Sequence, residues 1–371
     1  MDVGVMMEGL SPGVENGDHP DLDAARARML LGAGTMADRM LLPAEADREW
    51  AESRQLLEAL IVAHPEEPGL EATLTEALTA IGRGLLRRGK VAEALPPLVA
   101  AVAHGEAATA AAPRQAVFRY LLETALSTLA DARTASGDAE SGRALQERAR
   151  QVALELVALE PASARWHTAL AQAARELGRS AGMRADWPKA TTYLTEATQE
   201  YERLLVLDPS NRRVHLEAAS TLGMLADCET FVGHYDAARA GWKAALAHLE
   251  TLAQTLPSAR LDWAFGLQGY AQLEQQLGRK DLVAAAMDQA LALVVSTPNT
   301  HDEPQQTAYR AWVLTQVGSL RTTQHRSAEA FVYLQQAAMM FTSLAQRKQL
   351  QAGWQPPVAV LREAGFYVDQ P

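Results

Sequence analysis

The sequence predicts an all-α protein, a solenoid of about seven helix–turn–helix repeats, and three observations support this prediction. Prolines recur at a spacing of 48 residues, a period typical of stacked repeat proteins; they are Pro65, Pro113, Pro161, Pro209 and Pro257. Small and apolar residues recur in the same register between these prolines. No segment shows sustained strand-like alternation flanked by turn residues.

Each repeat unit contains one apolar column and three columns of small residues. The apolar column is Ile81, Leu129, Leu177 and Leu225. The small column directly after it is Gly82, Ala130, Gly178 and Ala226. The later small columns are Ala94, Gly142, Ala190 and Ala238, then Ala101, Ala149, Ala197 and Ala245. Small side chains at these positions allow two paired helices to approach closely.

The first helix of each unit is predicted from apolar residues that recur every three or four positions before a turn. The turn positions are Gly89, Gly137 and Gly233, with Ala185 in the remaining unit. Glycine adopts the left-handed conformation that ends a helix. A second helix then runs towards the next proline of the 48-residue series, since the residue before a proline is disfavoured in the helical region.

The two ends of the chain differ from the array, which we place at residues 21–346. Residues 1–20 lack periodicity and are expected to be disordered. Residues 347–371 contain a short amphipathic run, expected to cap the last repeat. The alternative for this tail is a docking peptide for another protein.

Two irregularities interrupt the array. The unit between Pro257 and Pro298 spans only 41 residues, so seven residues are missing, and both of its helices are expected to be shorter. Pro96 and Pro97 fall just inside a second helix, where proline removes a hydrogen bond. Either feature is expected to bend the array locally.

The chain resembles the tetratricopeptide repeat family. The first set of matching positions is Leu78, Ile81, Gly82, Gly89, Ala94, Leu98 and Ala101. The second set is Leu222, Leu225, Ala226, Gly233, Tyr235, Ala238, Trp242, Ala245 and Leu246. The resemblance implies a right-handed superhelix whose first helices line a concave face. The long units resemble the repeat arrays attached to bacterial signalling proteins such as Ser/Thr kinases and sensor ATPases.

Composition narrows the functional classes. The net charge of −11 disfavours nucleic acid, which is bound through clustered cationic groups. Cys228 is the only cysteine and is expected to be a buried small apolar residue. No secretory signal and no stretch long enough to span a membrane is visible, so a cytoplasmic location is expected. The excess of Arg over Lys is typical of a GC-rich bacterial genome.

No motif predicts catalysis, a cofactor or a metal ion. Gly84, Gly89 and Lys90 match part of a phosphate-binding loop, but Val91 stands where that motif needs Ser or Thr. The histidines lack ligand spacing: His167 and His215 lie one repeat apart, and a repeat-equivalent surface position is expected for both. We therefore expect a protein that is not an enzyme and that binds no cofactor.

The strongest candidate binding residues lie on the first helices. The residues two positions after the apolar column alternate in charge and are expected to be exposed: Arg83, Asp131, Arg179 and Asp227. Arg87 and Arg175 lie nearby. One interpretation is a solvated face with ion pairs worth about 0–1 kcal/mol each. The other is a groove in which Arg side chains hold carboxylates of a bound peptide.

Tryptophans give a second set of candidates. Trp166 and Trp263 fall early in first helices, where they are either exposed anchors for a partner or packing residues between helix ends. Trp50 and Trp242 fall in second helices at the family's aromatic column and are expected in the core.

These observations predict a non-catalytic scaffold or adaptor that binds a protein or peptide partner on the concave face. The first alternative is a regulatory domain of a bacterial signalling enzyme whose catalytic part lies elsewhere. The second alternative is a receptor for a peptide or small molecule.

Overall fold

The computed structural model describes residues 20–298 and 303–368, and every regular element in these ranges is a helix. Fourteen long helices form seven hairpins. Their bounds are α1 (Pro20–Arg39) and α2 (Pro43–Ala63), α3 (Pro68–Arg87) and α4 (Val91–Ala111), α5 (Ala116–Ala135) and α6 (Ala139–Leu159), α7 (Ala164–Met183) and α8 (Trp187–Leu207), α9 (Arg212–Val232) and α10 (Tyr235–Thr255), α11 (Ala259–Gln276) and α12 (Lys280–Ser296), and α13 (Pro304–Thr323) and α14 (Ser327–Gln346). The predicted all-α solenoid of seven repeats is confirmed. The expected disorder of residues 1–20 concerns a segment that, apart from Pro20, lies outside the described residues.

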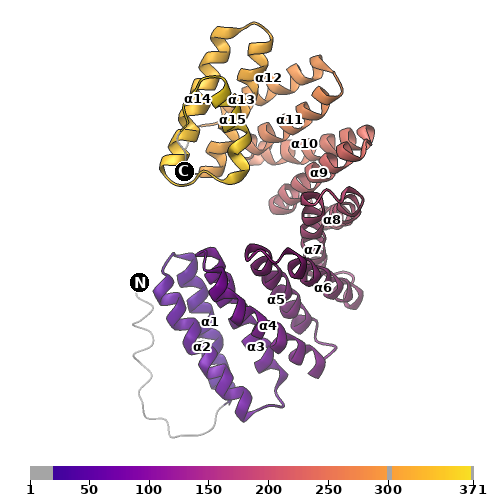
Figure 1. Ribbon diagram of the computed structural model, residues 1–371. Helices are drawn as coiled ribbons and strands as arrows, with labels where there is room; N and C mark the ends of the chain where they lie inside the picture. The colour runs from indigo at the N-terminus through magenta and orange to yellow at the C-terminus, as the bar shows by residue number, and fades with distance from the viewer. Residues whose placement is uncertain (1–19, 299–302, 369–371) are drawn as a thin grey trace. The chain divides into compact units, whose positions relative to one another are not determined.

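The chain divides into two compact units, with the division between Ala162 and Ser163. Unit 1 contains helices α1 to α6, and unit 2 contains helices α7 to α15. The hairpins of each unit can be followed in Figure 1.

Within each unit the odd-numbered helices form one layer and the even-numbered helices another. Consecutive odd helices contact one another, as α1 with α3, α3 with α5, α7 with α9, α9 with α11 and α11 with α13. Among the described helices, the main contacts of each even helix are instead with odd helices or, at the end of unit 2, with α15. The odd helices therefore form the inner layer of each unit.

A residue with positive φ separates the two helices of every hairpin. Four of the seven positions hold glycine: Gly89, Gly137, Gly233 and Gly278. Leu41, Ala185 and His325 adopt the same conformation at φ 57–60°, although a side chain there is disfavoured. The turn is therefore set by the repeat geometry, and the missing glycine at position 185 did not change it.

The column of small residues holds the hairpins closed. A Cβ atom on Gly82 would lie 2.4 Å from Leu98 Cγ, and one on Gly178 would lie 2.6 Å from Leu194 Cγ. Gly318 meets Leu334 in the same way. In each of these three hairpins a leucine of the second helix therefore packs on the space left by a glycine sixteen positions earlier.

The irregular hairpin is α11/α12, whose helices have 18 and 17 residues instead of 20 or 21. Arg310 of α13 is buried and donates hydrogen bonds to the carbonyl oxygens of Val294 (2.6 Å) and Thr297 (2.8 Å). These bonds occupy carbonyls that the end of α12 leaves without helical partners. Helix α4 is continuous through Pro96 and Pro97.

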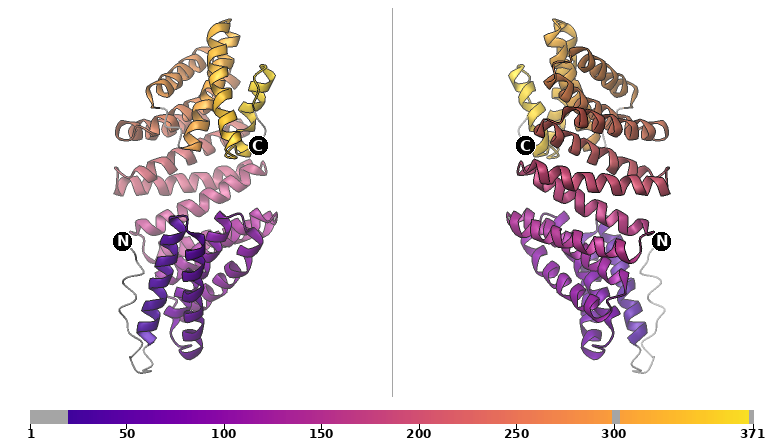
Figure 2. Two further views of the ribbon diagram at one scale, coloured as in Figure 1. Left: turned by 90° about the vertical axis from the view of Figure 1, so that its left-hand side faces the viewer. Right: turned by 90° about the vertical axis from the view of Figure 1, so that its right-hand side faces the viewer.

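A short 3₁₀ turn (Ala352–Trp354) and helix α15 (Gln355–Glu363) follow the last hairpin. Helix α15 packs against α13 and α14, with Trp354, Val358 and Leu361 buried. Figure 2 shows α15, in yellow, beside this hairpin. The end of unit 2 is thus covered by a helix that is not part of a repeat.

Candidate partner-binding site

The alternating charged column lies on the inner layer, one residue on each of four odd helices. Arg83, Asp131, Arg179 and Asp227 are all exposed. The same helix face continues one turn later, because residues four apart on a helix are neighbours. The residues at that next position are Arg87, Ala135, Met183 and Phe231, and all four are exposed as well. The two columns are purely polar or small in unit 1 and carry large apolar groups in unit 2.

In unit 1 the arginines of this face are already engaged. Arg87 forms an ion pair with Asp38 of α1. Arg83 lies 3.4 Å from the Thr128 hydroxyl on α5. Glu123 is buried nearby and accepts a hydrogen bond from Ser127 Oγ at 2.9 Å. Burial raises the pKa of Glu123 to about 7, and the hydroxyl hydrogen bonds and Arg83 only partly oppose this rise.

In unit 2 the arginines form a network across two inner helices. Arg175 of α7 contacts Glu217 of α9 at 3.0 Å and Glu176 at 3.3 Å. Arg179 contacts Glu176 at 2.7 Å, and its side chain remains 49% exposed. Partly exposed pairs of this kind are worth about 0–1 kcal/mol each. The network therefore adds little to stability and leaves Arg179 able to exchange Glu176 for a carboxylate of a partner.

An aromatic patch, defined here as Met183, Trp187 and Phe231, lies at the turn end of the first two hairpins of unit 2. The rings of Trp187 and Phe231 stack with centroids 4.4 Å apart and planes 9° from parallel. Met183 is 76% exposed and Phe231 is 64% exposed. Met183 Sδ also lies 3.5 Å from the Arg179 guanidinium. Trp, Phe, Met and Arg are the residues enriched at protein interfaces.

Asp227 precedes Phe231 by one helical turn on the same face of α9. Its carboxyl group reaches solvent but lies among protein atoms that weaken its hydration, and this raises its pKa to about 6. The patch is therefore bordered by a cationic group on α7 and an acid on α9. This arrangement can bind a chain with one large apolar side chain and neighbouring polar groups.

The expected surface position of His167 is wrong. His167 is buried between the helices of its hairpin, with Nδ1 2.5 Å from Glu200. His215 is half-buried at the equivalent position, and its Nδ1 lies 2.9 Å from Nδ1 of His248. Both histidines therefore hold two helices of one hairpin together, because this column faces the partner helix and not solvent.

Of the two interpretations of Trp166, the exposed binding anchor is excluded. Trp166 is only 4% exposed, since the early turns of α7 pack inside unit 2. Trp263 is half-buried and packs against core residues of the last three hairpins. The packing interpretation holds for both. Trp50 and Trp242 are buried as expected.

No other described part of the chain offers a better site. Gly84 lies inside α3 and Val91 begins α4, so the phosphate-loop-like sequence forms the end of one helix and the turn to the next. In the described ranges no group of three or more His, Cys, Asp or Glu residues is placed to hold a metal ion. None of the helices described there combines the length and apolar character needed to cross a membrane.

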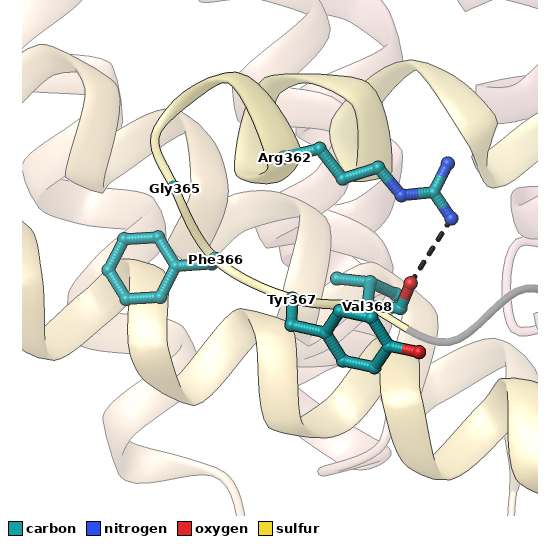
Figure 3. A pocket seen from close by; sticks show the side chains of 5 residues that line it. All are labelled: Arg362, Gly365, Phe366, Tyr367 and Val368. Carbon is teal, nitrogen blue, oxygen red and sulfur yellow. Dashed lines mark hydrogen bonds between the residues drawn. The ribbon is translucent and has the colours of Figure 1, made fainter.

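A hollow of about 480 Å³ lies after α15 and is lined by residues from a single stretch, 362–368. Figure 3 shows the Arg362 side chain over this loop, where it donates a hydrogen bond of 3.2 Å to the Val368 carbonyl oxygen. Gly365 turns the chain with φ +86°. The hollow is therefore enclosed by one loop, and Arg362, its only charged lining residue, is already used in the hydrogen bond that closes this loop.

Sequence reasoning missed the aromatic patch and Glu123. The signal for the patch was present, because Met183 and Phe231 follow the charged column by four residues. The signal for Glu123 was also present in the repeat. Its equivalents are Thr75, 48 residues earlier, and Ala171, 48 residues later, and both are fully buried. An acid in a column of small residues must be buried with them.

Comparison with known proteins supports the fold. No family model matches the chain, and no curated protein matches it. The apo form of RapI is similar in structure, with 9% identity over 92% of this chain and 82% of that chain and a TM-score of 0.57. BtubC (BKLC) from P. vanneervenii has 17% identity over 68% of this chain and 94% of its own, with a TM-score of 0.50. A tetratricopeptide repeat protein from Parabacteroides merdae has 15% identity over 91% and 99%, with a TM-score of 0.42.

Proposed function

Because the chain has the tetratricopeptide-repeat fold, we propose that it is a non-catalytic scaffold or adaptor that binds a peptide or protein partner on the inner layer of its odd-numbered helices. Stacked repeats present an extended surface for binding. The observation that carries the proposal is the aromatic patch beside Arg179 and Asp227. An exposed aromatic group with a charged border is the composition of an interface hot spot.

The charges support a partner with mixed polarity. Arg179 has an exposed guanidinium whose present partner, Glu176, belongs to the same helix. A carboxylate of the partner can take a bidentate position on such a group. Phe231 and Met183 supply apolar area, which contributes most of the binding free energy at interfaces of this type.

A regulatory role in a bacterial signalling system is the finer version of this proposal. It is supported by the likeness of the 48-residue units to arrays attached to signalling enzymes. Reading the genes adjacent to this one tests that version, and the absence of any signalling enzyme beside it would count against it.

The binding proposal is tested with peptides selected from a display library on the purified full chain. We expect Phe231→Ser to weaken the selected peptides by about thirty-fold or more, as for a hot-spot residue worth about 2 kcal/mol. Arg179→Glu is expected to weaken those peptides that carry a carboxylate. Val62→Ser is the matched control, because Val62 is 83% exposed and lies on α2, outside the inner layer. Peptides that bind the Phe231 and Arg179 variants as tightly as the wild type would refute this site.

A further inference from the structure

The last hairpin is covered by an additional helix, whereas the first hairpin has no such cover among the described residues. Unit 2 ends with α15, which covers α13 and α14. Helix α1, at the start of unit 1, contacts α2 and α3 but has no covering helix among the described residues on its remaining face. A terminal repeat of a soluble solenoid normally presents a polar outer face. The outer face of α1 is instead apolar.

That face is a continuous apolar stripe of large and small residues. The large residues are Leu22, Met29 and Met36, spaced by seven, and they are 66%, 64% and 57% exposed. The small residues between them are Ala25 and Gly32, which are also exposed. A Cβ atom on Gly32 would meet nothing within 4 Å. Seven-residue spacing of apolar residues is the pattern of a helix that packs against a second helix.

We infer that this face of α1 pairs with the same face of a second copy of the chain, in antiparallel orientation. In that register Met29 lies opposite Gly32 of the second copy and Met36 lies opposite Ala25, whereas Leu22 lies at the end of the pair, opposite Arg39. Large side chains facing small ones give the interlocking that helix pairs need. The arrangement is self-complementary, as a two-fold interface requires.

The charges at the edges of the stripe favour the antiparallel orientation. Asp21 lies at the start of α1 and Arg39 at its end, and both are exposed. Antiparallel pairing brings each Asp21 to an Arg39 of the second copy. Parallel pairing would instead leave Asp21 and Arg39 of the two copies at opposite ends of the pair, so this attraction would be lost.

The interface is small. A helix of 20 residues is about 30 Å long and about 10 Å wide, so one face buries less than the roughly 800 Å² per partner of a standard stable interface. We therefore expect a dimer that forms in the range of about 10–100 µM and dissociates on dilution.

Sedimentation equilibrium of the full chain over about 1–200 µM tests the proposal. We expect a reversible monomer–dimer equilibrium that Met29→Glu abolishes. Gly32→Leu fills the space that receives Met29 and is expected to weaken the dimer at least tenfold while the monomer keeps its helical circular dichroism. Val62→Glu is the control, because Val62 is 83% exposed on α2, outside the stripe, and its change is expected to leave dimerisation intact. A chain that is monomeric throughout, or a dimer that survives Met29→Glu, overturns the proposal.

Two further experiments test whether the helices are antiparallel and whether a second copy of α1, and not residues 1–19, covers this face. Ala25→Cys and Met36→Cys proteins, mixed under oxidising conditions, are expected to form a mixed disulfide. Each protein alone is expected to form little, whereas equal self-linkage of each protein would overturn the antiparallel register. Deletion of residues 1–19 is expected to leave the dimer intact. If the deletion abolished the dimer, residues 1–19 would be part of the interface. If a dimer appeared only after the deletion, residues 1–19 would cover this face of α1 in the full chain. Either result would overturn the pairing of α1 with α1.

Discussion

Replacing Glu123 with Gln is expected to stabilise unit 1 at alkaline pH and to have a much smaller effect at acidic pH. Glu123 is 6% exposed on α5, and burial raises its pKa from 4.5 to about 7. The folded state therefore binds a proton that the unfolded state releases in the window between these values. Stability is greatest below about pH 4.5 and falls as the pH rises through about 7, since the folded chain holds more protons there.

The size of the effect follows from the two pKa values. A difference of one in pKa corresponds to about 1.4 kcal/mol, so the full rise corresponds to roughly 3 kcal/mol. Between about pH 5 and about pH 8 the wild-type chain is expected to lose roughly 2–3 kcal/mol through this one group. The variant Glu123→Gln has the same shape, keeps an oxygen that accepts the hydrogen bond from Ser127, and never ionises.

Hydrogen exchange of peptides from residues 116–135, followed by mass spectrometry at increasing urea, measures this stability at both pH values. Comparing the variant with the wild type removes the titration of all other groups, including Asp227 and Asp262, whose pKa values burial raises to about 6. The difference in unfolding free energy between variant and wild type should grow by roughly 2–3 kcal/mol from about pH 5 to about pH 8. A difference that stays constant within about 0.5 kcal/mol would show that Glu123 is ionised in the folded chain, and the reasoning from burial would be refuted.

Three further predictions concern packing, a helix end and the thiol. Gly82→Ala places a Cβ atom 2.4 Å from Leu98 Cγ and should cost about 1–3 kcal/mol in urea unfolding, whereas Gly69→Ala, with nothing within 4 Å, should change stability by under about 0.5 kcal/mol; equal effects would contradict the packing account. Arg310→Ala removes charged hydrogen bonds to the end of α12 and should cost about 2–3 kcal/mol, seen as faster hydrogen exchange in α12; unchanged exchange would contradict the capping role. Burial raises the pKa of the Cys228 thiol to about 11, so a thiol reagent should label it at least about tenfold faster in urea than in buffer, and equal rates would count against its burial.

The fold could be predicted because its determinants repeat. Gly82 and Leu98 lie sixteen residues apart in one unit, and Gly178 and Leu194 repeat the pair two units later. A local rule that holds several times in one chain needs no knowledge of distant contacts. The turn at Ala185 shows the strength of this rule, since the backbone adopts φ 57° without a glycine.

The candidate site could be predicted only at positions whose side-chain exposure can be deduced from their place in the repeat pattern. The charged column is exposed as expected because it lies two residues after a core column on the same helix. The error at His167 and the two open interpretations of Trp166 have one cause. Both stand in the added turns at the front of the first helix, which the 34-residue family pattern does not contain, so no family column indicated which side of the helix packs. The division at Ala162 likewise leaves no mark in the 48-residue register.

The core positions are alike from repeat to repeat, whereas the exposed positions differ, and a binding function can reside only at positions that differ. Core columns fix the hairpins in both units, whereas the position one turn after the charged column holds Arg87 and Ala135 in unit 1 but Met183 and Phe231 in unit 2. These side chains contribute little to folding when exposed, so the fold does not require an apolar residue there. Exposed Met and Phe also carry a risk of nonspecific association. Their presence at corresponding positions of neighbouring repeats therefore supports the partner-binding site that we propose on unit 2.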